Sequence, residues 1–310
     1  MKKLVLLCGM MLLASPMAMG QGGPYTISIG SGDGSLSIND LYSWGHLGGD
    51  TATYDPVGSA AATTIWNMCW ALYDVSGDTM YFMDKAGFLA HTTRPTDGAI
   101  VTTATGMTNT GMTFGSTADL TANLAVNLTQ GITFPFPKAT FTWTFNNSAA
   151  TAKDLRLFWF VDMDNYLNTN DYFDDYVGMT PSANGGLAIV LSNSDGSGGL
   201  NMDEAIVADS DTAPDRWTGI SDNLGSSYYW SSTSNYAGIG VEAVKQIDDS
   251  LNLKVENDAD TNLVTDSGQD VAGAMQWNLS VPTSGSTTIN ATLTWGPGGS
   301  YLDIPQWENY

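Results

Sequence analysis

Cysteine, histidine and basic residues are scarce in this sequence. Its 310 residues include two cysteines, two histidines, and 10 Lys and Arg against 32 Asp and Glu. A zinc site needs three or four converging His, Cys or carboxylate ligands, so this supply disfavours zinc. Cys8 lies in an apolar N-terminal run, and Cys69 alone could not form an intramolecular disulfide once that run is removed. The formal net charge of −22 predicts a surface that repels nucleic acid and anionic membranes.

The shortage of these residues also removes most catalytic machinery. His46 and His91 lie far apart in the sequence, and no G-x-S-x-G nucleophile elbow occurs. The sequence contains neither a C-x-x-C-H haem motif nor a phosphate-binding loop. This composition favours a non-catalytic protein and leaves paired carboxylates as the one open catalytic route.

The first residues, 1–20, have the three parts of a secretory signal peptide. Two lysines precede an apolar run at 4–14, and small residues follow it. We expect cleavage near Gln21 and a single large β-sandwich domain over residues 21–310. The apolar run is too short to span a bilayer, so we expect no transmembrane segment after cleavage. The protein is therefore expected to be secreted, extracellular or held at the bacterial cell surface.

The rest of the chain has the composition of an all-β protein. Thr, Ser, Gly, Asn and aromatic residues are abundant, and no long stretch keeps the apolar period of a helix. Residues 139–145, ATFTWTF, alternate between two kinds of side chain, which predicts a half-buried strand. Turn signals predict hairpins at 76–78 and 282–286. About a dozen such strands predict a large two-layer antiparallel β-sandwich with long loops.

The most apolar strand expected lies at residues 154–161, DLRLFWFV, and is apolar on both faces. This pattern predicts a central strand buried between two layers. Aspartates crowd the segment that follows, and no Lys or Arg lies between Arg156 and Arg216 to neutralise them. Calcium prefers carboxylate oxygens, so we expect a calcium site built from Asp162, Asp164, Asp171, Asp174 and Asp175.

A second acidic loop has a spacing that resembles the EF-hand calcium loop. In residues 193–204, NSDGSGGLNMDE, oxygen-bearing side chains fall at positions one, three, five, nine and twelve, and glycine occupies position six. The loop departs from that family at its first position, which is normally aspartate, and a strand is expected where the family has a helix. The candidate ligands here are Asn193, Asp195, Ser197 and Glu204.

Aromatic residues gather in SSYYWSSTSNY, inside a long polar region at 193–236. A flat aromatic face can stack on a sugar ring while Ser and Asn side chains bond the sugar hydroxyls. This pattern indicates a ligand-binding surface at Tyr228, Tyr229, Trp230 and Tyr236. The alternative is that the tryptophans of this region close the end of the sandwich as part of its core.

Two functional interpretations remain open. The first is a non-catalytic surface, matrix or ligand-binding protein that calcium stabilises. The second is a carbohydrate-active protein, either a polysaccharide-binding module or a glycoside hydrolase with paired carboxylates such as Asp162 with Asp174 or Glu204. The expected partner is a polysaccharide or a component of the cell surface or matrix.

Four segments follow one another between residues 139 and 295: FTWTFNNS, RLFWFVDMD, GIGVEAV and AMQWNLSVPTSGSTTINATLTW. Their order resembles a pattern met in uncharacterised secreted or cell-surface β-sandwich proteins of bacteria. The resemblance implies an extracellular sandwich of structural or binding character, and it assigns no catalytic residue.

Overall fold

The structure is a computed structural model. It describes residues 25–29, 34–38, 51–54, 62–63, 67–82, 95–96, 98–130, 137–163, 175–181, 187–193, 205–221, 245–247, 249, 252–255, 258–261, 266 and 271–296. Only the backbone is described for the strands at 25–29, 34–38, 51–54, 62–63 and 187–193 and for parts of several others. Every regular element in these ranges is a β-strand, and they contain no helix long and apolar enough to cross a membrane.

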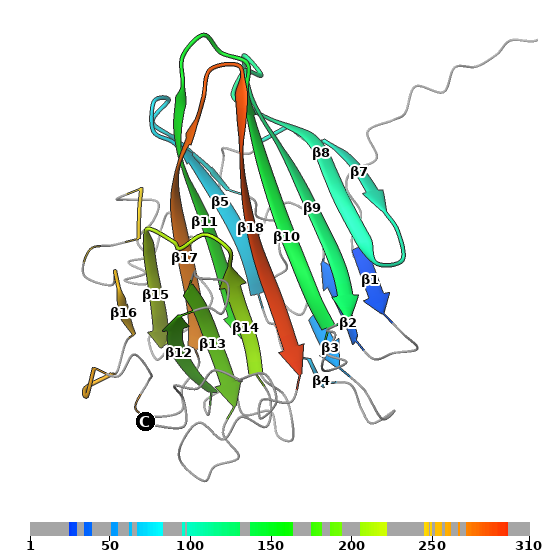
Figure 1. Cartoon of the computed structure of the whole chain (residues 1–310), viewed down its shortest axis with the longest axis vertical. Coiled ribbons are helices and arrows are strands. Elements are labelled where there is room, and N and C mark those ends of the chain that lie inside the picture. The colour runs from blue at the N-terminus through cyan, green and yellow to red at the C-terminus, as the bar shows by residue number, and fades with distance from the viewer. Residues whose placement is uncertain are drawn as a thin grey trace, which may run out of the picture.

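The larger sheet has eight strands, all paired antiparallel, and faces the viewer in Figure 1. In order across the sheet these are β12 (Asp175–Pro181), β13 (Leu187–Asn193), β14 (Ala205–Ser210), β18 (Gly285–Gly296), β10 (Pro137–Asn147), β9 (Leu120–Gln130), β8 (Gly106–Phe114) and β7 (Ala99–Thr102).

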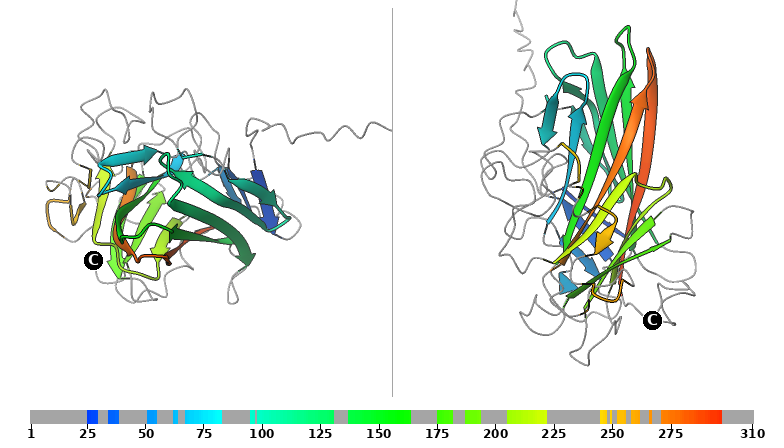
Figure 2. Two further views of the ribbon diagram at one scale, coloured as in Figure 1. Left: turned by 90° about the horizontal axis from the view of Figure 1, so that it is seen from above. Right: turned by 90° about the vertical axis from the view of Figure 1, so that its left-hand side faces the viewer.

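The second sheet has six strands and lies behind the first. Its order is β16 (Lys254–Val255), β15 (Arg216–Ser221), β17 (Val271–Val281), β11 (Lys153–Met163), β5 (Asn67–Asp74) and β6 (Thr79–Phe82). A separate small sheet contains β1 (Tyr25–Ile29), β2 (Gly34–Ile38), β3 (Thr51–Tyr54) and β4 (Ala62–Thr63). The two large sheets lie face to face (Figure 2), which confirms the predicted all-β sandwich. The short pair β15–β16 is parallel, a detail the sequence did not indicate.

Aromatic side chains from both large sheets meet in the core. Trp143 of β10 lies 5.9 Å from Trp159 of β11 and 6.4 Å from Trp70 of β5, measured between ring centroids. Phe141, on the same face of β10, stacks on Trp143 at 5.8 Å. Each of these side chains is at most 1 % exposed. Burial of large aromatic surfaces is the main favourable term that holds the layers together.

Strand β11 is central, as its apolar pattern predicts. It pairs with β17 on one side and with β5 on the other. Trp159 faces the other sheet, whereas Phe158 and Phe160 point to the opposite face, and all three are buried. The hairpin predicted at 76–78 is present, since β5 pairs with β6 across residues 75–78. The hairpin predicted across 282–286 is wrong: the chain turns there, but β17 pairs with β11 and β15 whereas β18 pairs with β10 and β14, so the turn carries the chain from one sheet to the other.

Strand β8 changes its pattern at a bulge. Met107 and Asn109 point inward at odd positions, whereas Met112 and Phe114 point inward at even positions. The register shifts between Thr110 and Met112, where Gly111 adopts a φ of +82°. Glycine tolerates this conformation, so the extra residue reverses the alternation without strain and keeps both halves of β8 packed on the core.

Candidate functional site

The outer face of the larger sheet carries an ordered array of uncharged side chains, all of them polar except Ala125. Cross-strand pairing of β9, β10 and β18 places them in four rows, which we call the neutral face. The rows are Thr121–Asn146–Ser286, Asn123–Thr144–Thr288, Ala125–Thr142–Asn290 and Asn127–Thr140–Thr292. Neighbouring strands lie about 4.8 Å apart and same-face residues about 6.7 Å apart along a strand, so these side chains form a regular grid.

Alternation explains why these residues face outward. In β10 the aromatic side chains at 141, 143 and 145 are buried, so the intervening Thr140, Thr142 and Thr144 must lie on the other face. Strands β9 and β18 repeat this arrangement, with buried Leu, Val, Ile and Ala between Thr and Asn. Most of the outward side chains are partly exposed, and Thr292 is buried.

Hydrogen bonds between strands fix several of these side chains. The Thr142 hydroxyl donates to Asn290 Oδ1 at 2.9 Å, and the Thr144 and Thr288 hydroxyls lie 3.1 Å apart. The backbone N–H of Gly111, in the bulge, donates to Asn123 Oδ1 at 2.8 Å. The array is therefore partly ordered without any ligand.

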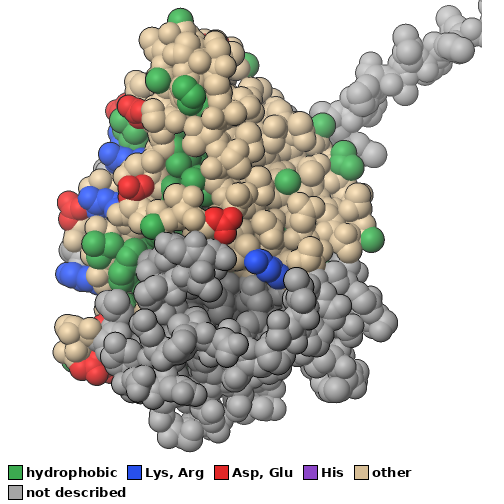
Figure 3. Space-filling model, in the orientation of Figure 1, with side chains coloured by type: hydrophobic (Ala, Val, Ile, Leu, Met, Phe, Trp, Pro, Cys, Tyr) green, Lys and Arg blue, Asp and Glu red, His purple; other side chains and the backbone are tan. Residues whose placement is uncertain are grey.

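The neutral face contrasts with the charge of the whole chain. None of its twelve side chains is ionisable, although the protein carries a formal net charge of −22. Figure 3 shows this side of the molecule with few charged groups over the larger sheet, whereas acidic and basic side chains gather along the left-hand edge. A ligand that docks on the neutral face desolvates hydroxyl and amide groups, which costs much less than desolvating ions.

One row of the neutral face opens into a polar groove at the end of the sandwich. The groove has a volume of about 470 Å³, and its lining residues are Asp119, Thr121, Asn146, Asn147, Ser148, Ser284, Gly285 and Ser286. Thr121, Asn146 and Ser286 form the first row of the array, so groove and face are continuous.

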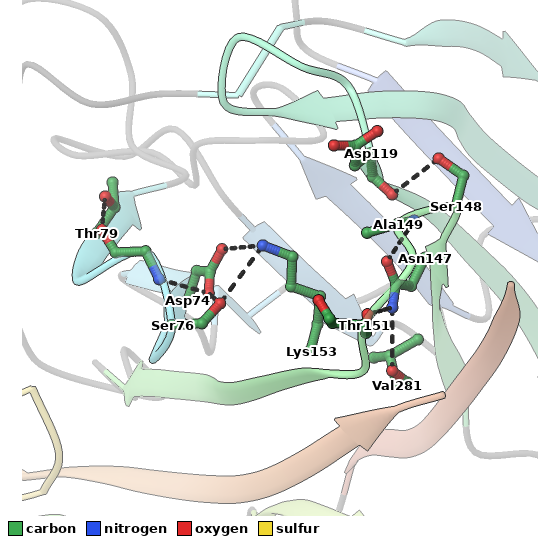
Figure 4. A network of polar contacts seen from close by, with 11 residues as sticks. Asp74, Ser76, Thr79, Asp119, Asn147, Ser148, Ala149, Thr151, Lys153 and Val281 are labelled. Carbon is green, nitrogen blue, oxygen red and sulfur yellow. Dashed lines mark hydrogen bonds and ion pairs between the residues drawn. The ribbon is translucent and has the colours of Figure 1, made fainter. Parts of the chain in front are cut away.

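Asn147 is a buried residue of the groove lining, and its side chain holds the neighbouring backbone in place (Figure 4). Its Nδ2 donates to the carbonyl oxygens of Thr151, at 2.8 Å, and Val281, at 3.2 Å, and its Oδ1 accepts from Ala149 N–H at 2.9 Å. The Ser148 backbone N–H donates to the carbonyl oxygen of Asp119 at 2.8 Å. These bonds hold the β10–β11 turn against the start of β9, and both polar atoms of the Asn147 side chain take part in bonds within the protein.

Charged residues occupy the outer face of the second sheet. The Tyr73 hydroxyl donates to Asp78 Oδ1 at 2.8 Å, Lys245 also binds Asp78, and the ammonium group of Lys245 lies 5.4 Å from the Tyr73 ring centroid. Burial, followed by the bond to Asp78, raises the pKa of the Tyr73 hydroxyl. The bond from Lys245, followed by that from Tyr73, lowers the pKa of Asp78, and the pKa of Lys245 is raised in return. These charges satisfy one another, as expected of a structural cluster.

Side chains of the same sheet face hold a further chain segment, described at residues 245–247 and 249, against the sheet. Arg156 donates to the carbonyl oxygen of Lys245 at 2.7 Å, and Arg216 donates to that of Ile247 at 2.8 Å. The backbone N–H of Ile247 donates to the buried Oε1 of Gln276 at 2.8 Å. The two arginines therefore bind the backbone of this segment, and we call residues 245–247 and 249 the strap.

The predicted calcium ligands fall mainly outside the described residues. Asp164, Asp171, Asp174, Asp195, Ser197 and Glu204 all lie there. The backbones of three others are placed: Asp162 near the end of β11, Asp175 at the start of β12, and Asn193 at the end of β13. Asp175 and Asn193 are directly paired across β12 and β13, which joins the two predicted calcium loops at their bases. Asp162 belongs to the other sheet, where it pairs with Ala272 and Asn67.

The predicted aromatic platform, Tyr228, Tyr229, Trp230 and Tyr236, also lies outside the described residues. Trp217, which belongs to the same 193–236 region, is described; it is 8 % exposed and lies within the core, as the alternative interpretation of that region expects. The aromatic surface therefore stays a prediction.

Sequence reasoning missed two features of this structure. The carboxylate oxygens of Asp258, Asp260 and Asp266 lie within 4.8 Å of one another, close enough to share a cation, and the alternating pattern D-A-D-T-N was the available signal. The neutral face was visible only as the outward half of one strand, ATFTWTF, because strand order is needed to assemble the grid.

Together the fold and the face define a two-sheet sandwich with an uncharged polar surface. No family model and no curated relative matches the sequence. A bacterial glucoamylase solved in complex with acarbose shares the fold, with a TM-score of 0.50 and 9 % identity over 91 % of this chain. A galactose mutarotase related enzyme from Lactobacillus acidophilus is less similar, with a TM-score of 0.41 and 8 % identity over 89 % of this chain and 98 % of its own. This chain spans 34 % of the length of the glucoamylase, and at such identity the likeness shows the fold alone.

Proposed function

We propose that this protein is an exported β-sandwich that binds a neutral polysaccharide without cleaving it. The observation that carries the proposal is the neutral face, a grid of Thr, Asn and Ser side chains in a strongly acidic protein. Hydroxyl and amide groups both donate and accept hydrogen bonds, so they match the hydroxyls of an uncharged sugar chain. The signal-peptide pattern at residues 1–20 supports export to where such polymers occur.

The size and order of the face also support an extended ligand. Four rows along the strands span about 20 Å, which accommodates several sugar units in succession. Bonds such as Thr142 to Asn290 hold hydroxyls in place before binding, which lowers the entropy cost of association. The groove beside Asp119 adds a concave end at which the chain can terminate. The bacterial glucoamylase with this fold was solved with acarbose, which makes a soluble glucan a reasonable first probe.

Glycoside hydrolysis stays the alternative. It depends on pairs such as Asp162 with Asp174 or Glu204, whose side chains lie outside the described residues. Incubation of the protein with each polysaccharide that it binds, followed by assay of new reducing ends, tests this alternative directly.

Binding to a panel of neutral and charged polysaccharides, measured by affinity electrophoresis, tests the proposal. Retardation by a neutral glucan, galactan or xylan is expected. The double variant Thr142→Lys with Thr144→Lys should abolish it, because two desolvated ammonium groups would oppose docking. The matched control is Ala104→Lys with Thr105→Lys, which adds the same charge in the exposed β7–β8 turn. Equal losses in both variants, or binding to charged polymers alone, would overturn the proposal.

A further inference from the structure

The edge strand of the larger sheet has unusual exposure. Strand β7 forms the right-hand margin of the sheet in Figure 1 and pairs only with β8 among the described strands. Its side chains are exposed except for Ile100, which packs against the core. Val101 is 59 % exposed, more than any other large hydrophobic side chain in the described part of the chain. An apolar edge of this kind is a template for another strand.

The alternation of hydrogen-bonded and non-hydrogen-bonded pairs between β7 and β8 shows which backbone groups of β7 point away from the sheet. The Thr103 N–H donates to the carbonyl oxygen of Gly106 at 2.7 Å at the turn. Bonded and non-bonded pairs alternate along an antiparallel ladder, so the pair Val101–Thr108 is bonded and the pairs on either side of it are not. The backbone groups of Ile100 and Thr102 therefore point away from β8, toward solvent.

Sequence features that normally block an exposed edge are missing from this hairpin. Residues 98–118 contain no Asp, Glu, Lys, Arg or Pro, in a chain with 42 charged residues counted as 10 basic and 32 acidic. Edge strands that must stay single are usually protected by a lysine, a proline or an inward charge. The bulge at Gly111 lies on β8, the inner strand, and leaves β7 itself regular.

We propose that β7 pairs antiparallel with β7 of a second copy of this chain, about a two-fold axis at Val101. In that register Ile100 of each copy meets Thr102 of the other, and their outward N–H and C=O groups bond in both directions. Val101 lies on the same face as Thr108, to which it is paired, so the two copies of Val101 bury each other beside the neutral face. The larger sheet and its neutral face then continue across both copies.

Charge and length set the expected behaviour of this dimer. The pairing strand has only four residues, so association depends on protein concentration. Each copy carries a formal charge of −22, and the two copies repel at low salt. Because the Debye length falls from about 30 Å at 0.01 M salt to about 8 Å at 0.15 M, dimerisation should strengthen as salt is added. This inference does not depend on sugar binding.

Sedimentation velocity of the purified protein over a range of concentrations tests the proposal at low and high salt. We expect a monomer–dimer equilibrium that shifts toward dimer with salt. Val101→Lys should raise the dimer Kd at least ~10-fold, since it places like charges opposite each other. Thr102→Pro, which removes an outward N–H but no bond to β8, should do the same. Val75→Lys is the matched control, because Val75 is also exposed, at 38 %, but lies in the β5–β6 turn.

Each outcome decides the question. Loss of dimer in Val101→Lys and Thr102→Pro with retention in Val75→Lys supports the pairing. A monomer at every concentration and salt overturns it, as does an equal effect of both lysine variants. A series of growing oligomers would also overturn it, because a two-fold pairing closes at the dimer. If Val101→Lys fails to fold, Thr102→Pro alone still decides between these results.

Discussion

The hydroxyl of Thr142 donates to Asn290 Oδ1 at 2.9 Å, and the two residues are 148 positions apart in the sequence. The bond joins β10 to β18 at the centre of the neutral face. A neighbouring contact between the Thr144 and Thr288 hydroxyls, at 3.1 Å, repeats the arrangement one row away. Polar side chains on this face are thus positioned by one another as well as by the backbone, which favours a binding role over a purely solvating one.

The variant Thr142→Val should weaken polysaccharide binding while changing the stability of the fold only slightly. The variant keeps the shape of the side chain and loses the hydroxyl, and the partly exposed Asn290 can bond to water instead. We therefore expect the free energy of unfolding to fall by about 1 kcal/mol or less. Affinity for the polysaccharide should fall about 5- to 10-fold, which calorimetric titration measures. Thr105→Val, in the exposed turn, is the control, and an equal loss of affinity there would contradict the assignment of the face.

Two buried tryptophans differ in their hydrogen bonding and should respond differently to Phe. Trp143 Nε1 is buried without an acceptor, whereas Trp277 Nε1 donates to the carbonyl oxygen of Thr212 at 2.8 Å. Trp143→Phe removes an unsatisfied donor, and Trp277→Phe removes a satisfied one. We expect Trp277→Phe to reduce the free energy of unfolding by about 1–3 kcal/mol more than Trp143→Phe. Urea unfolding with unchanged m-values measures this difference, and a larger cost for Trp143→Phe would refute it.

Asp74 should make stability depend on pH in acid. Burial acts to raise the pKa of its carboxyl group, but bonds from Ser76 and Gly77 and the charge of Lys153 outweigh burial and hold the pKa below its usual value of 3.8. A carboxyl group with a lowered folded-state pKa stabilises the protein above the unfolded-state pKa, and this contribution disappears as pH falls through the folded-state value. Stability should therefore decline below about pH 4.

Asp74→Asn should flatten that decline, as measured by urea unfolding between about pH 6 and pH 2. Asp154→Asn is the control. Asp154 is an exposed residue of β11, and its replacement by Asn removes the same negative charge as Asp74→Asn does. The same slope in wild type and Asp74→Asn would show that Asp74 is not the group responsible.

Gln276 should control how firmly the strap is held. Gln276→Met keeps the volume but leaves the Ile247 N–H without its acceptor in a buried place. We expect a loss of about 1–3 kcal/mol in local stability, seen as about 5- to 150-fold faster amide exchange at residues 245–247 and 249. Gln246→Met, at a partly exposed neighbour, should leave exchange unchanged. Protection that survives in Gln276→Met would mean that the two arginines alone hold the strap.

Calcium binding stays a prediction, and thermal unfolding in EDTA and in excess calcium checks it. A ligand at about 100 times its Kd stabilises the folded state by about 2.7 kcal/mol, which shifts the midpoint visibly. Asp162→Asn with Asp164→Asn should remove the response if the loop after β11 binds the ion. Asp258→Asn with Asp260→Asn should remove it if the second cluster does. If the midpoint of thermal unfolding is the same in EDTA and in excess calcium, both sites would be excluded.

Local patterns predicted the strands well and the architecture only in outline. The alternation in ATFTWTF and the two-faced apolar run before Asp162 both correspond to observed strands, β10 and β11. The bulge at Gly111 broke the alternation in β8, so a simple period-two reading fails there. The parallel pair β15–β16 joins Thr218 to Lys254, more than 30 residues further along the chain. Turn residues indicate pairing only between strands that follow one another closely, so the sequence could not predict this pair.

The sequence by itself determined that this chain forms strands with aromatic inner faces and threonine-rich outer faces, because side-chain alternation is a local property of the extended backbone. It also determined the strong negative charge and the shortage of catalytic histidine and cysteine. Only the tertiary structure decided which strands are neighbours, since pairing between segments as distant as Thr142 and Asn290 depends on how the whole core packs. That pairing turned separate polar stripes into one neutral face and left β7 as an exposed edge.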